Sequence, residues 1–131
     1  MKLIESIKAA KRVYIIGNGG SYANSIHITN DLLSVGIKAY TMDVATFSAF
    51  ANDHGYYKAF ARWLSVVGEK EDLLIALSGS GRSPNILMAI DEAEKIGMKV
   101  ERVFGAPAMG MQHAEEHQIW LGHQAMLALK K

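Results

Sequence analysis

The chain has no cysteine and only two prolines among its 131 residues. Without cysteine it can form neither disulfide bonds nor thiolate metal sites, and it offers no thiol nucleophile. Hydrophobic residues make up 50% of the chain, which is typical of a folded protein rather than a disordered one. We therefore expect a packed apolar core, and any metal site must use imidazole and carboxylate ligands.

An excess of charge of one sign is also missing, because the formal net charge is +1. No long basic run appears, which argues against nucleic-acid binding driven by clustered lysine and arginine. Residues 1–6 lack the apolar core of a signal peptide, and no apolar stretch is long enough to span a bilayer. We therefore expect a soluble cytoplasmic protein without a membrane partner, folded as a single domain over residues 1–131.

Four segments are predicted to be β-strands: residues 13–16, 38–43, 73–77 and 100–104. The continuously apolar third segment is typical of a strand that is covered on both faces of a parallel sheet. Strands alternating with helices predict an α/β fold, a three-layer αβα sandwich with a parallel sheet of four to five strands. The segment 105–110 is expected to be a mobile or irregular loop.

Helical patterns fill the intervals between these strands. They cover residues 22–34, two pieces of 47–67 on either side of the turn at 52–55, residues 84–96, and about 112–129. The first of these places one stripe of residues along a helix face, with His27 and Asp31 beside it: Ala23, Ile26, Asn30 and Leu33.

Two strand-to-helix loops are predicted to bind a ligand. The first is Gly17-Asn18-Gly19-Gly20-Ser21, and the second is Ser78-Gly79-Ser80-Gly81-Arg82-Ser83. Ligands of open α/β sheets bind at the carboxyl ends of strands, where glycines and helix N-termini bring backbone N–H groups to an anion. A serine there can simply cap a helix. Three serines with two glycines instead favour a phosphate site, because each hydroxyl can donate to a phosphate oxygen.

A nucleotide site is the competing interpretation of these loops. Asp43 lies near the end of the second strand, where a ribose-binding acid would stand. However, the third glycine of the dinucleotide motif G-x-G-x-x-G falls on Tyr22, and no Gly-Lys-Ser/Thr follows either loop. Dinucleotide and Walker A sites are therefore disfavoured.

The chain resembles the sugar isomerase (SIS) domain family, and within it the phosphoheptose isomerase branch. The matching motifs occur in family order over residues 13–100: the loop 17–21 followed by His27, then Asn52-Asp53, Phe60-Ala61-Arg62, Val67-Gly68, Asp72-Leu73-Leu74, the serine loop and Gly97-Met98-Lys99-Val100. The resemblance implies a flavodoxin-like sandwich that forms a homo-oligomer, a dimer or tetramer, with active sites between subunits. It also implies aldose–ketose isomerisation of sedoheptulose 7-phosphate to a heptose 7-phosphate through an enediol, without an organic cofactor.

The resemblance also assigns roles to residues. The substrate-binding positions are Asn18, Gly19, Gly20, Ser21, Asn52, Asp53, Ser78, Gly79, Ser80 and Ser83. Asp31 takes the place of the catalytic base and His123 that of the acid. A zinc ion is implied at four residues, His27, Asp31, Glu115 and His123, with Glu116 as the alternative to Glu115 if the register is shifted by one.

Several departures from the family keep a second function open. Asp31 is one methylene shorter than the family's glutamate, Glu115 stands where the family has glutamine, and Arg82 replaces an asparagine. The chain also resembles a trimmed member of the family, with about one long helix missing ahead of Val13 and a segment between Phe104 and His113 that is too short for the family's fifth strand. The alternative is therefore a non-catalytic phosphosugar-binding or assembly module. His27 and Asp31, four residues apart, can also be an ordinary surface hydrogen bond, and His113 and His117 are expected on a solvated helix face.

Overall fold

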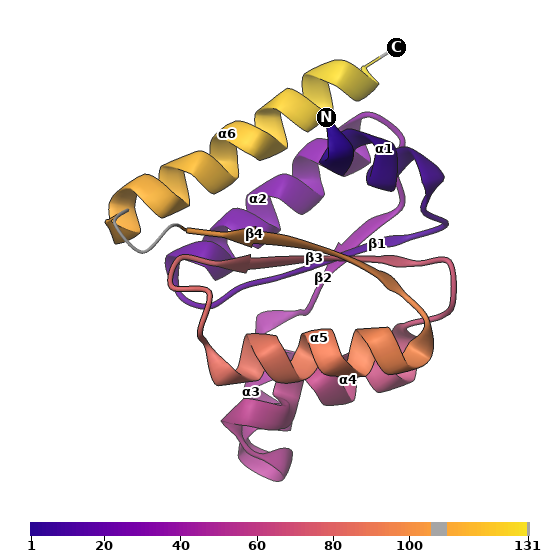
Figure 1. Cartoon of the computed structure of the whole chain (residues 1–131). Coiled ribbons are helices and arrows are strands. Elements are labelled where there is room, and N and C mark those ends of the chain that lie inside the picture. Colours follow the sequence, from indigo (N-terminus) through magenta and orange to yellow (C-terminus); the bar gives the residue numbers. More distant parts are fainter. Residues whose placement is uncertain (106–109, 131) are drawn as a thin grey trace.

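The computed structural model describes residues 1–105 and 110–130, which form three layers of helix, sheet and helix (Figure 1). The strands are β1 (Val13–Ile16), β2 (Ala39–Thr41), β3 (Leu73–Ser78) and β4 (Lys99–Phe104). The helices are α1 (Lys2–Ala9), α2 (Gly20–Ser34), α3 (Val44–His54), the 3₁₀ turn η1 (Tyr56–Lys58), α4 (Ala59–Val67), α5 (Pro84–Ile96) and α6 (Met111–Leu129).

The four strands form one parallel sheet in the order β2-β1-β3-β4. This order is that of flavodoxin-like folds, so the predicted fold class is confirmed. β2 is three residues shorter than the predicted segment 38–43. In the part of the chain that the structure describes there is no fifth strand, and residues 106–109 of the predicted irregular loop lie outside that part.

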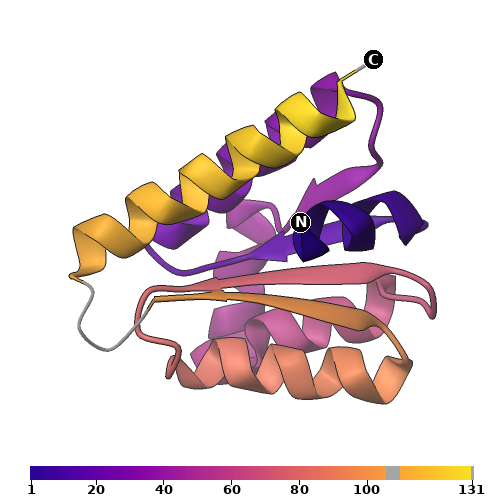
Figure 2. The same ribbon diagram turned by 45° about the horizontal axis from the view of Figure 1, so that its top comes forward.

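Alternate residues of each central strand supply two separate cores. Val13 and Ile15 of β1 face the layer of α1, α2 and α6, whereas Tyr14 and Ile16 face α4 and α5. Figure 2 shows α6 running along α2 over one face of the sheet, with α4 and α5 beneath the other. Because both faces are covered, all six residues of β3 are buried, as its apolar sequence predicted.

Local signals at its two ends explain why α5 matches the predicted range. Pro84 stands at the start of the helix, where its missing N–H costs nothing. Gly97 ends it in the left-handed conformation at φ +98°, which glycine adopts without strain. The intervening face buries Ile86, Ile90 and Ala93 against the sheet.

The stripe predicted on α2 is not its buried face. Ile26 and Leu33 are 47% and 53% exposed, whereas Ser25, Thr29 and Asp31 are buried. Periodicity identifies residues that share a face, but it does not say which face a neighbouring helix covers. The buried face of α2 also carries Ile28 and Leu32, which pack in the core, and α6 contacts α2 at Ile28 and Asn24, so the predicted stripe faces outward.

The helix α1 was not predicted from the sequence. It packs Ile7 into the core beside Val13, and Ser6 donates to Glu101 of β4. Among the described residues, no helix combines the length and apolar character needed to cross a membrane. The cytoplasmic location and the single domain stay predictions.

Candidate functional site

The two predicted ligand loops flank the topological switch point of the sheet. β1 and β3 are neighbours, and the chain continues from β1 outward to β2 but from β3 outward to β4. The two connections therefore leave the carboxyl ends of β1 and β3 in opposite directions, and ligands of open α/β sheets bind at such a point. Residues 17–21 follow β1 and residues 79–83 follow β3, so the fold brings the two loops together.

A pocket of about 80 Å³ lies between these loops. Its lining consists of Asn18, Ser21, Leu77, Ser78, Gly79, Ser80, Ser83 and Met111. Three helices begin at its edge, α2 at Gly20, α5 at Pro84 and α6 at Met111. Their unpaired N–H groups and the positive ends of their dipoles favour an anion there. A larger hollow of about 570 Å³ lies on the outer side of α4 and α5, away from both loops, and its lining includes none of the predicted site residues.

The hydroxyl groups of the serine loop are arranged to donate to a ligand. Ser78 Oγ accepts from the Gly81 N–H at 3.0 Å, and Ser80 Oγ accepts from the Arg82 N–H at 3.1 Å. Each oxygen therefore uses a lone pair on the backbone and keeps its hydrogen for another acceptor. Ser83 stands at the N-cap position just before α5, its side chain makes no capping hydrogen bond, and its hydroxyl lies 3.4 Å from that of Ser78. The helix-cap interpretation therefore does not describe Ser83, and the hydroxyl arrangement suits a phosphate.

Glycines let neighbouring elements close in on the serine loop. A Cβ on Gly105, at the end of β4, would collide with the backbone oxygen of Gly79. A Cβ on Gly79 itself would overlap the sulfur of Met111. The loop is thus held between β4 and the first turn of α6, and Gly81 completes its turn at φ +69°.

The first loop is held by side chains that the sequence did not single out. Asn18 exchanges two hydrogen bonds with Asn85 of α5, and the Tyr56 hydroxyl donates to Asn18 Oδ1. Gly17 lets the loop turn closely, since a Cβ there would lie 2.7 Å from the backbone of Ser21. The sequence could have indicated Asn85 as a site residue, because it stands in the first turn of the helix that directly follows the serine loop.

The remaining predicted substrate residues do not line this pocket. Gly19 and Gly20 are exposed at the start of α2. Asn52 and Asp53 are exposed near the end of α3, where Asn52 Nδ2 donates to Asp53 Oδ1 at 3.2 Å. Their contact with a sugar stays a prediction.

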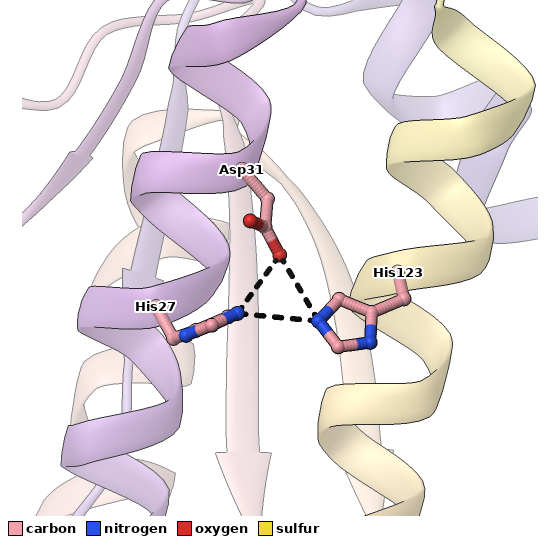
Figure 3. A group of neighbouring side chains, drawn as sticks. All are labelled: His27, Asp31 and His123. Carbon is pink, nitrogen blue, oxygen red and sulfur yellow. Dashed lines mark hydrogen bonds and ion pairs between the residues drawn. The ribbon is translucent and has the colours of Figure 1, made fainter.

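His27, Asp31 and His123 meet between α2 and α6, although His27 and His123 are 96 residues apart in the chain (Figure 3). The two Nε2 atoms are 3.2 Å apart, and Asp31 Oδ2 lies 3.3 Å from that of His27 and 3.6 Å from that of His123. Despite these short distances Oδ2 has no hydrogen-bond partner, and it is buried. A buried carboxylate oxygen without a partner is costly, so the site is suited to a cation.

The three atoms of this triad fit a tetrahedral zinc ion. Zinc binds nitrogen and oxygen ligands at about 2.0–2.2 Å, which separates neighbouring tetrahedral ligands by about 3.3 Å. The observed separations of 3.2, 3.3 and 3.6 Å agree with that value. With these three ligands alone, a zinc ion would keep one position for a substrate or water, as in catalytic zinc sites.

A glycine beside His123 allows the triad to form. A Cβ on Gly122 would lie 2.6 Å from Cγ1 of Ile28, the residue next to His27. The two helices therefore approach closely at the point where the histidines face each other. An isolated glycine inside a helical pattern often marks a close contact with a neighbouring element. Gly122 could therefore have indicated from the sequence that another helix packs closely at this point.

Glu115 and Glu116 are not part of the triad. Glu115 precedes His123 by eight residues on a continuous helix, a rise of about 12 Å. Its carboxylate packs against Gly20, and its backbone oxygen accepts from Asn24. Glu116 is exposed. Within one chain neither residue reaches the triad, so a fourth protein ligand stays a prediction.

Comparison with known proteins identifies the family of the chain. The family model of the SIS domain matches residues 1–103. The phosphoheptose isomerase of Buchnera aphidicola subsp. Acyrthosiphon pisum is 37% identical over 128 residues, which covers 92% of this chain and 66% of that enzyme. The chain thus spans just under two thirds of that relative's length.

Two solved structures share the fold. A phosphoheptose isomerase from Francisella tularensis superposes with a TM-score of 0.88 at 25% identity, covering 98% of this chain and 82% of that one. The phosphoheptose isomerase GmhA from Neisseria gonorrhoeae gives the same TM-score at 22% identity, covering 97% and 80%. These likenesses agree with the fold, and the family-model match over residues 1–103 shows that the chain belongs to the SIS domain family.

Proposed function

We propose that this chain is a subunit of a phosphosugar isomerase that converts sedoheptulose 7-phosphate to an aldoheptose 7-phosphate. The observation that carries the proposal is the pairing of a serine-lined anion pocket with a His–Asp–His triad of zinc-site dimensions. The pocket accounts for the phosphate, and the triad offers the groups that proton transfer between carbons requires. The 37% identity to a phosphoheptose isomerase supports the choice of reaction.

In this proposal the serine loop anchors the phosphate through the hydroxyl hydrogens of Ser78, Ser80 and Ser83. Asp31 accepts the proton from the carbon next to the carbonyl, and His123 serves the sugar oxygens as an acid. A zinc ion held by His27, Asp31 and His123 would polarise the carbonyl and thereby acidify that carbon. Burial of Asp31 keeps bulk water away from its carboxylate.

The separation between pocket and triad favours a site shared by two chains. Ser21 lines the pocket, and Asp31 lies ten residues further along α2, a rise of about 15 Å. A sugar anchored by the loop of one copy would therefore meet the triad of another. The exposed apolar residues Ile26, Leu33 and Trp120 stand on the two helices that carry the triad and supply a surface for that second copy.

The direct test incubates the purified protein with sedoheptulose 7-phosphate and follows formation of the aldose. Metal analysis of protein prepared without chelator accompanies it, and we expect about one zinc ion per chain. No turnover at high enzyme concentration would overturn the isomerase. Thermal stabilisation by sugar phosphates without turnover would instead identify the non-catalytic binding module.

Mixing two inactive variants tests the shared site. In a symmetric dimer that exchanges subunits, Ser80→Ala and Asp31→Asn chains form mixed dimers with one intact site, which restores roughly a quarter of the activity. A site within one chain would give no recovery. Light scattering gives the subunit number independently.

A further inference from the structure

Two asparagines at the edge of the pocket form a reciprocal amide pair. Asn18 Nδ2 donates to Asn85 Oδ1 at 2.8 Å, and Asn85 Nδ2 donates back to Asn18 Oδ1 at 2.8 Å. The Tyr56 hydroxyl donates to the same Oδ1 at 3.0 Å. We call Asn18, Asn85 and Tyr56 the amide clamp, because it joins the first loop to α5 and η1.

The clamp determines what Asn18 can offer to a ligand. A carbonyl oxygen has two lone pairs, and both of those on Asn18 Oδ1 are taken, one by Asn85 and one by Tyr56. The amide nitrogen has two hydrogens, of which Asn85 takes one. Because Asn18 lines the pocket, its side chain meets a ligand as a hydrogen-bond donor with one N–H.

The rigidity of the clamp comes from Asn85. This residue is 1% exposed and stands in the first turn of α5, two positions after the last serine of the loop. The element that presents the serine hydroxyls therefore also orients Asn18. Two hydrogen bonds of 2.8 Å thus join the first loop to the helix that follows the serine loop.

We propose that Asn85 and Tyr56 are positioning residues that hold Asn18 as a donor to a sugar oxygen of the phosphosugar bound at the serine loop. The inference rests on the proposed function for the identity of the ligand. It adds that the protein distinguishes a phosphorylated sugar from bare phosphate by a donor fixed at one place. Inorganic phosphate fills the serine loop without needing that donor.

Two conservative variants test the clamp by calorimetric titration. Tyr56→Phe removes one hydroxyl from a residue that is 48% exposed, and Asn85→Asp keeps the shape but replaces a donor by an acceptor. An acidic residue is tolerated in the first turn of a helix, which helps Asn85→Asp to fold. We expect Tyr56→Phe to bind sedoheptulose 7-phosphate about three- to tenfold more weakly, the effect of one hydrogen bond, with a smaller change for inorganic phosphate. Asn85→Asp should weaken both probes, because it also places a negative charge beside the anion pocket, and the sugar phosphate should lose more than inorganic phosphate.

Tyr57→Phe is the matched control. Tyr57 is the next residue, it is 58% exposed, and its hydroxyl makes no hydrogen bond to other residues that the structure describes. It should bind both probes as the unmodified protein does. Equal losses in Tyr56→Phe and Tyr57→Phe, or no loss in Tyr56→Phe and Asn85→Asp, would overturn the proposal.

A spectroscopic measurement separates failure of the clamp from failure of the proposed function. In ¹H–¹⁵N spectra without ligand, Tyr56→Phe should shift the side-chain amide resonances of Asn18 and Asn85, whereas Tyr57→Phe should not. Unshifted resonances would refute the clamp whatever the ligand is. Shifted resonances in a protein that binds no sugar phosphate would uphold the clamp's geometry but overturn both its role and the proposed function.

Discussion

Gly122→Ala tests the close helix approach that assembles the triad. The new Cβ would lie 2.6 Å from Ile28 Cγ1 and 3.2 Å from Ile28 Cδ1. Carbon atoms prefer about 3.5–4.0 Å, so α2 and α6 must separate or Ile28 must move by up to about 1 Å. Such overpacking costs about 1–3 kcal/mol, against which alanine gains about 1 kcal/mol over glycine in a helix.

A double-mutant cycle isolates the overlap from the helix preference. In the Ile28→Ala background the nearest remaining atom of the side chain is its Cβ, at an ordinary 3.6 Å. There Gly122→Ala should raise the free energy of unfolding by about 1 kcal/mol, because only the helix preference acts. The two backgrounds should therefore differ by about 1–3 kcal/mol in urea unfolding with chelator present. An equal effect in both backgrounds would refute the close approach.

The same variant should weaken zinc binding, since the triad needs both helices in place. We expect about a tenfold loss of zinc affinity or more, the size found when groups that orient metal ligands are removed. Gly110→Ala is the control, because its Cβ meets no atom of the described residues within 4 Å and its φ of −68° suits any residue. Unchanged zinc affinity in Gly122→Ala would show that this contact does not control the triad.

Three further predictions concern single side chains. Ser80→Ala should abolish thermal stabilisation by sedoheptulose 7-phosphate. The control Ser65→Ala removes a hydroxyl on α4 that is hydrogen-bonded within its own helix, and it should retain the stabilisation. Retention in both variants would exclude the serine loop as the anchor. Asp31→Asn should lower bound zinc in metal analysis, yet leave the metal-free protein as stable or more stable in urea unfolding, because the buried Oδ2 loses a charge that has no hydrogen-bond partner. Burial raises the pKa of Tyr22 to about 12, with Asp43 adding to the effect. Its neutral form therefore stabilises the fold fully below pH 10, and this contribution is lost as the pH rises through 12, a loss that Tyr22→Phe should reduce in alkaline unfolding curves.

Features that depend on neighbours in the chain were open to prediction from the sequence. The buried strand β3, the ends of α5 at Pro84 and Gly97, and the two ligand loops all follow from local patterns, and the structure has them where they were expected. The bounds of the short strand β2 and the existence of the helix α1 were harder to predict. β2 depends on its pairing with β1, and α1 depends on contacts such as that of Ser6 with Glu101 of β4. The exposure of Ile26 and Leu33 could not be predicted from the sequence either, because it depends on where α6 packs.

The sequence by itself determined the family, the alternation of strands and helices, and the serine loop, because these reside in motifs and short-range periodicity. Only the tertiary structure decided that His123 joins His27 and Asp31 while Glu115 does not. The same holds for the hydrogen-bonded pair of Asn85 and Asn18. The physical reason is that a ligand set and a hydrogen-bonded pair are defined by distances of about 3 Å between segments far apart in the chain. Those distances come from packing, here from one glycine that lets two helices touch.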